Sequence, residues 1–250
     1  MSFKAMVWVV ASTVLVGRSA VAQTRPVTDT IPASRDALIG LAFMGTAAAM
    51  GPFDGRIAVA AQQPSVQRST ILRGGSRVFN ALGDPGTVVL SLGAYGVGWI
   101  THNRDIAAIG LHATQAIGVS FIAGEMMKGV VGRARPFVNI HDSDDFYWGR
   151  GFGSARESSF PSGHAYAAFA LASVLSAETS HRWPHAVKWV APLAYTLATC
   201  VGLARIQTNQ HWASDVIAGA GLGTASGLLV VHFNEAHDDN FLERTFLPSP

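Results

Sequence analysis

Charged residues are scarce in this sequence. They make up 14% of its 250 residues, whereas an average soluble domain has roughly 25%. Lysine occurs only three times, and the basic residues form no clustered stretch, which excludes the basic face that nucleic-acid binding requires. With 49% hydrophobic residues and a mean hydropathy of +0.27, the composition favours a membrane protein.

Cysteine is nearly absent. Cys200 is the single one, within the apolar run LAYTLATCVGLA. One cysteine excludes an intrachain disulfide, and we expect a buried, inert thiol.

The first 22 residues have the pattern of a targeting segment. Lys4 gives the positive end, residues 5–17 carry no charge, and Ala20 and Ala22 form a small-residue cleavage site. We therefore expect residues 1–22 to be a signal peptide or a retained signal anchor, and the chain to be exported. Their removal would balance the basic and acidic residues of the remaining chain.

Six stretches of 16 to 20 residues carry no charge, and a helix that crosses a bilayer needs roughly 20 residues. They are 37–53, 85–103, 106–124, 158–177, 189–204 and 216–234. They are rich in Gly, Ala, Ser and Thr, so a buried bundle of soluble helices stays an alternative. However, Gly219, Gly223 and Gly227 recur every four residues and would form a groove along one face of a helix. Such a groove favours close packing of membrane helices. We predict an all-α, six-helix bundle that is integral to the membrane.

The uncharged stretches divide the chain into four parts. Behind the targeting segment, residues 23–84 form an N-terminal segment with one apolar helix (37–53) and a surface connection (54–84) with a short helix. Residues 85–234 form the helical core that we expect to be catalytic, and residues 235–250 form a C-terminal tail. A second long polar insert covers 125–157, and a loop of that length inside a compact domain is usually functional.

Three polar segments are expected to meet at one end of the bundle. If neighbouring helices alternate in direction, the exit of helix 106–124, the entrance of helix 158–177 and the link 204–216 share one side. These places read KGVVGRARP, PSGH and ARIQTNQHWASD. Topology alone therefore gathers the polar residues that the rest of the core lacks.

The first chemistry that these segments support is anion binding. Lys128, Arg135 and Arg205 could hold a highly charged anion, because guanidinium groups match phosphate oxygens bidentately. A helix that begins at PSGH adds free backbone N–H groups, and Gly163 allows close backbone approach. His164 then lies where a departing oxygen of a bound phosphate needs a proton, which is the place of a general acid.

The second is nucleophilic attack. His211 and Asp215 are four residues apart, hence on one face of a helix. A carboxylate there can fix the tautomer of the imidazole and leave its other nitrogen free to attack. Each of these residues by itself is more often a cap, a surface residue or a topology signal. Three groups of complementary chemistry at one end favour a phosphate site.

These residues resemble the type 2 phosphatidic acid phosphatase superfamily, whose signature reads K-x6-R-P, P-S-G-H and S-R-x5-H-x3-D. Here the three parts are Lys128 to Pro136, Pro161 to His164, and Arg205 to Asp215, in family order. The similarity covers about residues 85–234. One position departs from the signature, because Ala204 stands where the family has Ser and one possible hydroxyl contact to phosphate is missing.

The resemblance implies roles for the individual residues. His211 would form a phosphohistidine, Asp215 would activate it, and His164 would protonate the leaving group. It also implies that neither a metal nor another cofactor takes part. The phosphate-binding residues that it implies are Lys128, Arg135, Ser162, Gly163 and Arg205.

Several polar residues fall outside the signature. Arg133 is equally consistent with support of the site and with a surface charge. The acidic run HDSDD (141–145) is interpreted as a solvated loop, or one paired with Arg150 and Arg156, rather than as a metal site. His112 and His232 lie within apolar runs and are interpreted as packing or interface residues.

The resemblance implies hydrolysis of a phosphomonoester or diphosphate. The expected substrate is a membrane lipid such as phosphatidate, phosphatidylglycerol phosphate or a polyprenyl diphosphate. Positive residues prefer the inner side of a membrane, so the positions of Arg104, Arg182 and Lys188 favour a site that faces the periplasm or exterior. Three alternatives remain: a soluble, periplasmic or secreted acid phosphatase of the same superfamily, a vanadium haloperoxidase, and a non-enzymatic membrane transporter.

Overall fold

The computed structural model describes residues 32–237 and 240–248. The prediction of a targeting segment at residues 1–22 lies outside the described residues. Within them the chain forms helices and loops, and the only bridge between extended residues joins Arg133 and Phe146. The prediction of an all-α fold is confirmed.

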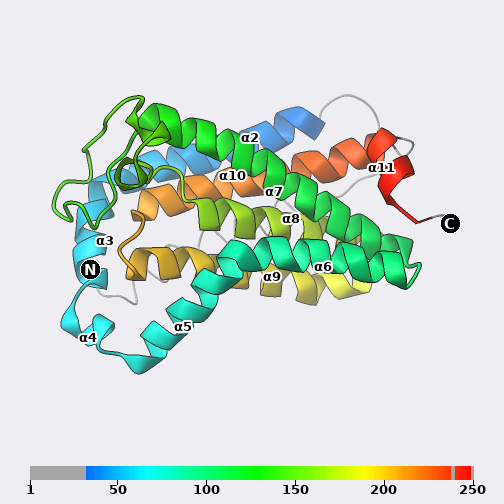
Figure 1. Ribbon diagram of the computed structural model, residues 1–250, viewed down its shortest axis with the longest axis horizontal. Helices are drawn as coiled ribbons and strands as arrows, with labels where there is room; N and C mark the ends of the chain where they lie inside the picture. The colour runs from blue at the N-terminus through cyan, green and yellow to red at the C-terminus, as the bar shows by residue number, and fades with distance from the viewer. Residues whose placement is uncertain (1–31, 238–239, 249–250) are drawn as a thin grey trace.

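Six helices of 14 residues or more form the body of the described structure (Figure 1). They are α2 (Pro32–Met50), α6 (Thr87–Ile100), α7 (Arg104–Val131), α8 (Gly163–Arg182), α9 (Pro184–Gln207) and α10 (Ala213–Ala236). Shorter helices are α3 (Asp54–Ala61), α4 (Pro64–Gln67), α5 (Thr70–Ala81) and α11 (Phe241–Phe246), and the segment η2 (Leu82–Gly86) links α5 to α6. Each predicted uncharged stretch thus corresponds to one long helix.

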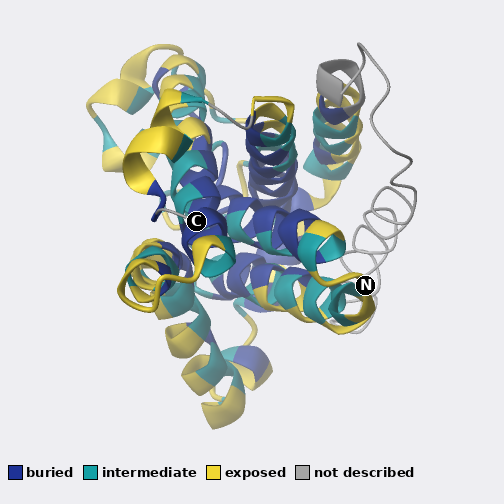
Figure 2. Ribbon diagram, turned by 90° about the vertical axis from the view of Figure 1, so that its right-hand side faces the viewer, coloured by how far each residue is buried: buried dark blue, intermediate teal, exposed yellow. Residues whose placement is uncertain are grey.

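Helices α8 and α10 pack together at the centre of the bundle, where Figure 2 shows the densest burial. The glycines of α10 allow this contact. A Cβ on Gly219 would lie 2.5 Å from the carbonyl oxygen of Ser162, and one on Gly227 would lie 2.7 Å from Cβ of Ser173. A Cβ on Gly223 would overlap the carbonyl group of Tyr166. The small residues therefore bring two helix backbones together, as membrane helix packing favours.

Four helical stretches of the described chain are long and apolar enough to cross a membrane: Asp36–Ala61, Arg104–Val131, Pro184–Gln207 and Ala213–Ala236. Outward-facing side chains on these helices are strongly apolar, with Ile122 68% and Trp189 73% exposed. The protein is a membrane protein. Two predicted spans are absent from the four, because α6 has only 14 residues and α8 carries polar groups along its length. Thirteen of the 20 residues of α8 are buried, so it is surrounded largely by other helices.

The region 54–84 contains more ordered structure than the single short helix of our prediction. It forms α3, α4 and α5, and Asp54, Ile57, Ala58 and Ala61 of α3 are buried. Helix α3 contacts both α9 and α10. Cys200 on α9 is half-buried rather than buried.

Candidate active site

The three polar segments meet at one end of the bundle, on the left in Figure 1. The backbone N–H of Ser162 donates to the carbonyl oxygen of Asp215 at 3.0 Å, which joins the start of α8 to α10. Nδ1 of His211 lies 2.7 Å from the carbonyl oxygen of Ser159. At the end of α7, Gly132 takes a left-handed conformation (φ +60°), which stops the helix and turns the chain toward Arg133 and Arg135.

Two arginines of this site keep buried donors without a partner. Nε of Arg135 and Nε of Arg205 are inaccessible to solvent and form no hydrogen bond, and the same is true of Oγ of Ser162. Arg205 donates from Nη1 to Oδ1 of Asn80 at 2.7 Å, and Arg135 donates from Nη1 to Oε1 of Gln210 at 3.2 Å. Both partners are neutral. Since an unsatisfied buried donor costs about 1–3 kcal/mol, an anion with several acceptor oxygens would stabilise this arrangement.

The start of α8 adds backbone donors to the same place. The N-cap residue Ser162 makes no side-chain capping bond, and the first N–H groups of a helix lack intrahelical partners. Nζ of Lys128 approaches Gly163 so closely that a Cβ there would lie 3.1 Å from it. A larger side chain at position 163 would therefore push Lys128 away from the N-terminus of α8.

Lys128 also has a carboxylate partner that the sequence analysis missed. Nζ of Lys128 lies 2.5 Å from Oε1 of Glu125, and this oxygen also accepts from the hydroxyl of Tyr166 at 3.1 Å. Glu125 is 44% exposed. A bound phosphate would compete with Glu125 for the ammonium group.

His211 is held by a backbone carbonyl rather than by a carboxylate. Its Nδ1 is 2.7 Å from the oxygen of Ser159 but 3.8 Å from Oδ2 of Asp215. A carbonyl oxygen only accepts, so Nδ1 carries the proton and Nε2 is left with a free lone pair. Burial lowers the pKa of His211 to about 4, although Asp215 acts in the opposite direction. The imidazole is therefore neutral at physiological pH, as a nitrogen nucleophile must be.

His164 is the second residue of α8 and lies among the cations. Burial lowers the pKa of its imidazole, and the positive charges of Arg205, Lys128 and Arg135 act in the same direction, as does His211. A Cβ on Gly83 of η2 would lie 2.9 Å from Cδ2 of His164, so this segment packs directly on the ring. All eight residues proposed for the site thus belong to one end of the bundle.

Arg133 is buried and ion-paired, so it is not a surface charge. It is 4% exposed and donates to Oδ1 of Asp215 at 2.6 Å and to Oδ2 of Asp54 at 2.9 Å. Burial by itself would lower the pKa of Arg133, but the two carboxylates raise it above its ordinary value. For Arg135, burial lowers the pKa despite the more distant carboxylates of Asp215 and Glu125.

The polar residues outside the signature have structural partners. His112 contacts Glu178 and Glu243, and Nδ1 of His232 lies 2.7 Å from Oδ2 of Asp36. In the run 141–145, Asp145 accepts from the hydroxyl of Tyr147 at 3.0 Å. Among the described residues no group of three or more His, Cys, Asp or Glu side chains is arranged to hold a metal ion.

The arrangement is that of an anion site with a neutral histidine beside it, at one end of a membrane helix bundle. Residues 109–239 match the family model of the PAP2 superfamily. This is more than half of the chain, and the chain belongs to that superfamily. The three polar segments lie inside the matched region, whereas Asp54 and Asn80 lie outside it.

Individual relatives agree with this assignment. The chain is 43% identical to a lipid A 1-phosphatase of Porphyromonas gingivalis over 72 residues, which is 29% of this chain and 15% of that protein. It is 31% identical to a lipid A 1-phosphatase of Rhizobium etli over 131 residues, half of each chain. The chain therefore spans half or less of the length of these curated relatives.

A solved structure shows the same fold. The crystal structure of a transmembrane PAP2-type phosphatidylglycerolphosphate phosphatase from Bacillus subtilis superposes with a TM-score of 0.60 at 23% sequence identity. The match covers 80% of this chain and 96% of that one. At this identity the likeness establishes the helical architecture.

Proposed function

We propose that this protein is a metal-independent phosphatase that hydrolyses a phosphomonoester or diphosphate of a membrane lipid through a phosphohistidine. One observation carries the proposal: the unpartnered buried donors of Arg135, Arg205 and Ser162 lie beside a neutral histidine whose Nε2 is free. The family membership and the names of the relatives support the same activity.

In the first step, Nε2 of His211 attacks phosphorus and the bond from phosphorus to the ester oxygen breaks. His164 gives its proton to the departing oxygen, so an alcohol leaves from a phosphomonoester and a monophosphate leaves from a diphosphate. In the second step, water attacks the phosphohistidine, His164 takes a proton from that water, and inorganic phosphate leaves. His211 and His164 return to their starting states. The sum is one phosphomonoester plus water giving alcohol plus phosphate, or one diphosphate plus water giving a monophosphate plus phosphate.

The surrounding charges suit both steps. Burial and the three cations around His164 oppose its protonation in the empty site. The negative charge of a bound phosphate dianion acts in the opposite direction, so substrate binding favours the protonated acid. Lys128, Arg135, Arg205 and the N-terminus of α8 stabilise the negative charge that develops on the transferring group. In other phosphoryl-transfer sites a metal ion supplies this stabilisation.

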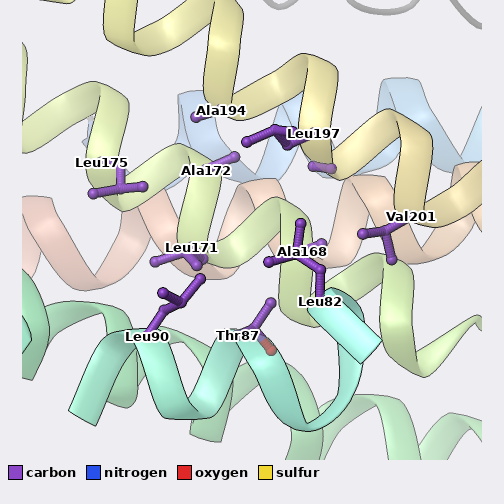
Figure 3. A pocket seen from close by; sticks show the side chains of 11 residues that line it. Leu82, Thr87, Leu90, Ala168, Leu171, Ala172, Leu175, Ala194, Leu197 and Val201 are labelled. Carbon is purple, nitrogen blue, oxygen red and sulfur yellow. The ribbon is translucent and has the colours of Figure 1, made fainter. Parts of the chain in front are cut away.

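An apolar cavity next to the site supports a lipid substrate over a soluble phosphate. The cavity has a volume of about 90 Å³ and lies between α6, α8 and α9 (Figure 3). Ala168, one helical turn after His164, lines it, and so does Val201. A Cβ on Gly83 would contact both Val201 and His164, at 2.7 and 2.9 Å. A hydrocarbon chain in this cavity would therefore continue directly from a phosphate at His164.

The proposed substrates are phosphatidate, phosphatidylglycerol phosphate and polyprenyl diphosphate, to which the names of the relatives add lipid A 1-phosphate. The site is proposed to face the periplasm or exterior. Arg104, Arg182 and Lys188 lie at the opposite end of the helices, and positive residues prefer the inner side.

A phosphate-release screen of purified protein against these lipids and against soluble esters tests the proposal. We expect lipid turnover that persists in excess EDTA and is inhibited by vanadate. Absence of phosphate release from every ester, or loss of activity on chelation that Mg²⁺ restores, would refute it. Peroxide-dependent halide oxidation would indicate the haloperoxidase alternative, and extraction without detergent would indicate the soluble phosphatase.

Filling the apolar cavity tests the lipid assignment. Ala194 is half-buried and lines the cavity from α9, so Ala194→Phe should lower kcat/KM for long-chain lipids and leave a soluble ester unaffected. Leu193, 62% exposed and outside the cavity lining, provides the matched control Leu193→Phe. Equal effects of the two variants on lipid turnover would show that the cavity does not bind the hydrocarbon chain.

A further inference from the structure

We infer that Asp54 and Arg133 are positioning residues for the histidine nucleophile, an inference that rests on the proposed function. The signature assigns no role to either residue. Arg133 occupies an unspecified position between Lys128 and Arg135, and Asp54 lies on α3, outside the matched family region. The two side chains form a buried ion pair at 2.9 Å, with Asp54 0% and Arg133 4% exposed.

Arg133 has no donor left for a phosphate. Its Nε and Nη2 donate to the carbonyl oxygen of Ser143 at 3.0 and 2.7 Å. Nη1 donates to Oγ of Ser214 and to Oδ1 of Asp215, and Nη2 also donates to Asp54. A guanidinium group has five N–H donors, and these five contacts use all of them. This distinguishes Arg133 from Arg135, whose Nε is unpartnered.

Asp54 fixes the other side of this contact. Its Oδ1 accepts from the backbone N–H of Ser214 at 2.9 Å, and its Oδ2 accepts from the hydroxyl of the same residue as well as from Arg133. Ser214 is the second residue of α10. Asp54 therefore anchors the guanidinium group and the N-terminus of α10 at once.

Asp215 connects this ion pair to the nucleophile through hydrogen bonds. While Oδ1 is held by Arg133, Oδ2 accepts from Oγ of Ser159 at 2.5 Å and from the backbone N–H of Trp212 at 2.9 Å. Ser159 supplies the carbonyl that holds Nδ1 of His211, and Trp212 is the next residue in the chain. The backbone N–H of Ser159 in turn donates to the carbonyl of Arg133 at 3.0 Å. Arg133 thus holds the residue whose carbonyl orients the imidazole, and also the carboxylate that binds Ser159 and Trp212.

Two conservative variants test the inference. Asp54→Asn keeps an oxygen for Ser214 but removes the charge, and Arg133→Lys keeps the charge but removes the fork that reaches both carboxylates. We expect kcat to fall about 10- to 100-fold in each, as for groups that orient catalytic or metal-bound histidines. The inhibition constant of inorganic phosphate should stay within about twofold, because the phosphate-binding side chains are unchanged. Asp144 and Arg156 are exposed residues of the segment that links α7 to α8 and contains Arg133. The variants Asp144→Asn and Arg156→Gln serve as matched controls and should keep wild-type values.

A spectroscopic readout separates this inference from the proposed function. Nitrogen NMR of histidine-labelled protein, with the His211 signal assigned by its loss in His211→Gln, should show the Nδ1–H tautomer in the wild type and a mixture in both variants. A wild type that releases phosphate and variants with wild-type kcat and tautomer would overturn the inference alone. A wild type without turnover would refute the proposed function, while the tautomer still tests the positioning role. Loss of phosphate binding in step with kcat, or failure to recover folded variants, would show a general structural role and would also overturn the inference.

Discussion

The two ends of helices α7 and α8 both bury ionisable groups, but they treat positive charge differently. At the site end, Arg135 and Arg205 have neutral partners and keep unpaired donors. At the opposite end, Arg182 pairs with Glu178 at 2.8 Å and with Asp105, and His112 lies 2.5 Å from Glu178.

This difference supports the proposed phosphate site. A buried cation without a counter-ion costs free energy. At the opposite end Arg182 has two carboxylate partners, so we interpret this cluster as a structural connection. It joins α7 to α8 and, through Glu243, to α11. At the site end the missing negative charge is that of the proposed phosphate.

The largest expected effect comes from the same substitution at each end. His211→Gln should lower turnover at least about 10⁴-fold, because it removes the nucleophile. His112→Gln should leave kcat within about twofold and should lower the melting temperature, since Glu178 loses a buried partner. Steady-state kinetics and thermal unfolding in detergent measure both. Phosphohistidine trapped by rapid quenching in the His211→Gln protein would contradict the assignment.

His164 gives the next largest effect, and it depends on the leaving group. A positioned general acid contributes about 10²- to 10⁴-fold, so His164→Ala should slow a lipid phosphate by roughly this factor. The same variant should slow p-nitrophenyl phosphate much less, because the phenolate leaves without a proton. The ratio of kcat/KM for the two esters is the measurement. An unchanged ratio would mean that His164 only positions the phosphate.

Substituting one arginine at each end, Arg205 and Arg182, tests the difference between the two ends directly. Arg205→Gln should lower kcat/KM for both esters by comparable factors of about 10²-fold, because its charge is needed whichever group departs. It should also raise the melting temperature slightly, since an unmatched buried cation is removed. Arg182→Gln should leave kcat/KM unchanged and lower the melting temperature, because Glu178 and Asp105 lose their partner. Equal changes of the melting temperature in the two variants would contradict the difference in charge pairing between the two ends.

Much of the fold follows from the sequence. The uncharged stretches predicted the six long helices, and the spacing of Gly219, Gly223 and Gly227 predicted the close contact of α10 with a neighbour. The alternation of helix directions brought the three polar segments to one end. Helix α8 is not among the four long apolar helices, because it is surrounded by other helices and tolerates polar groups such as Glu178.

The predicted site residues are present, but their supporting groups could not be predicted. The partner of Nδ1 of His211 is the backbone carbonyl of Ser159, and a carbonyl has no signature in a sequence. Asp54 and Asn80 reach the site only because α3 and α5 pack against it. Their contacts span more than 70 residues of sequence, beyond the reach of any local spacing.

The smallest expected effect is a pH dependence of stability at the site end. Burial lowers the pKa of His211 to about 4 in the folded protein, against about 6.5 in an unfolded chain. A group whose pKa is lower in the folded state stabilises the fold fully above its unfolded pKa. This stabilisation is lost as the pH falls from about 6.5 toward about 4, because the unfolded chain then binds a proton that the buried imidazole resists. Between pH 7 and 4.5 the melting temperature of His211→Gln should therefore fall less than that of the wild type, by roughly 2–4 °C for each kcal/mol of this stabilisation. Unfolding curves of both proteins over this range measure the difference, and parallel curves would show that His211 is protonated as easily in the site as in water.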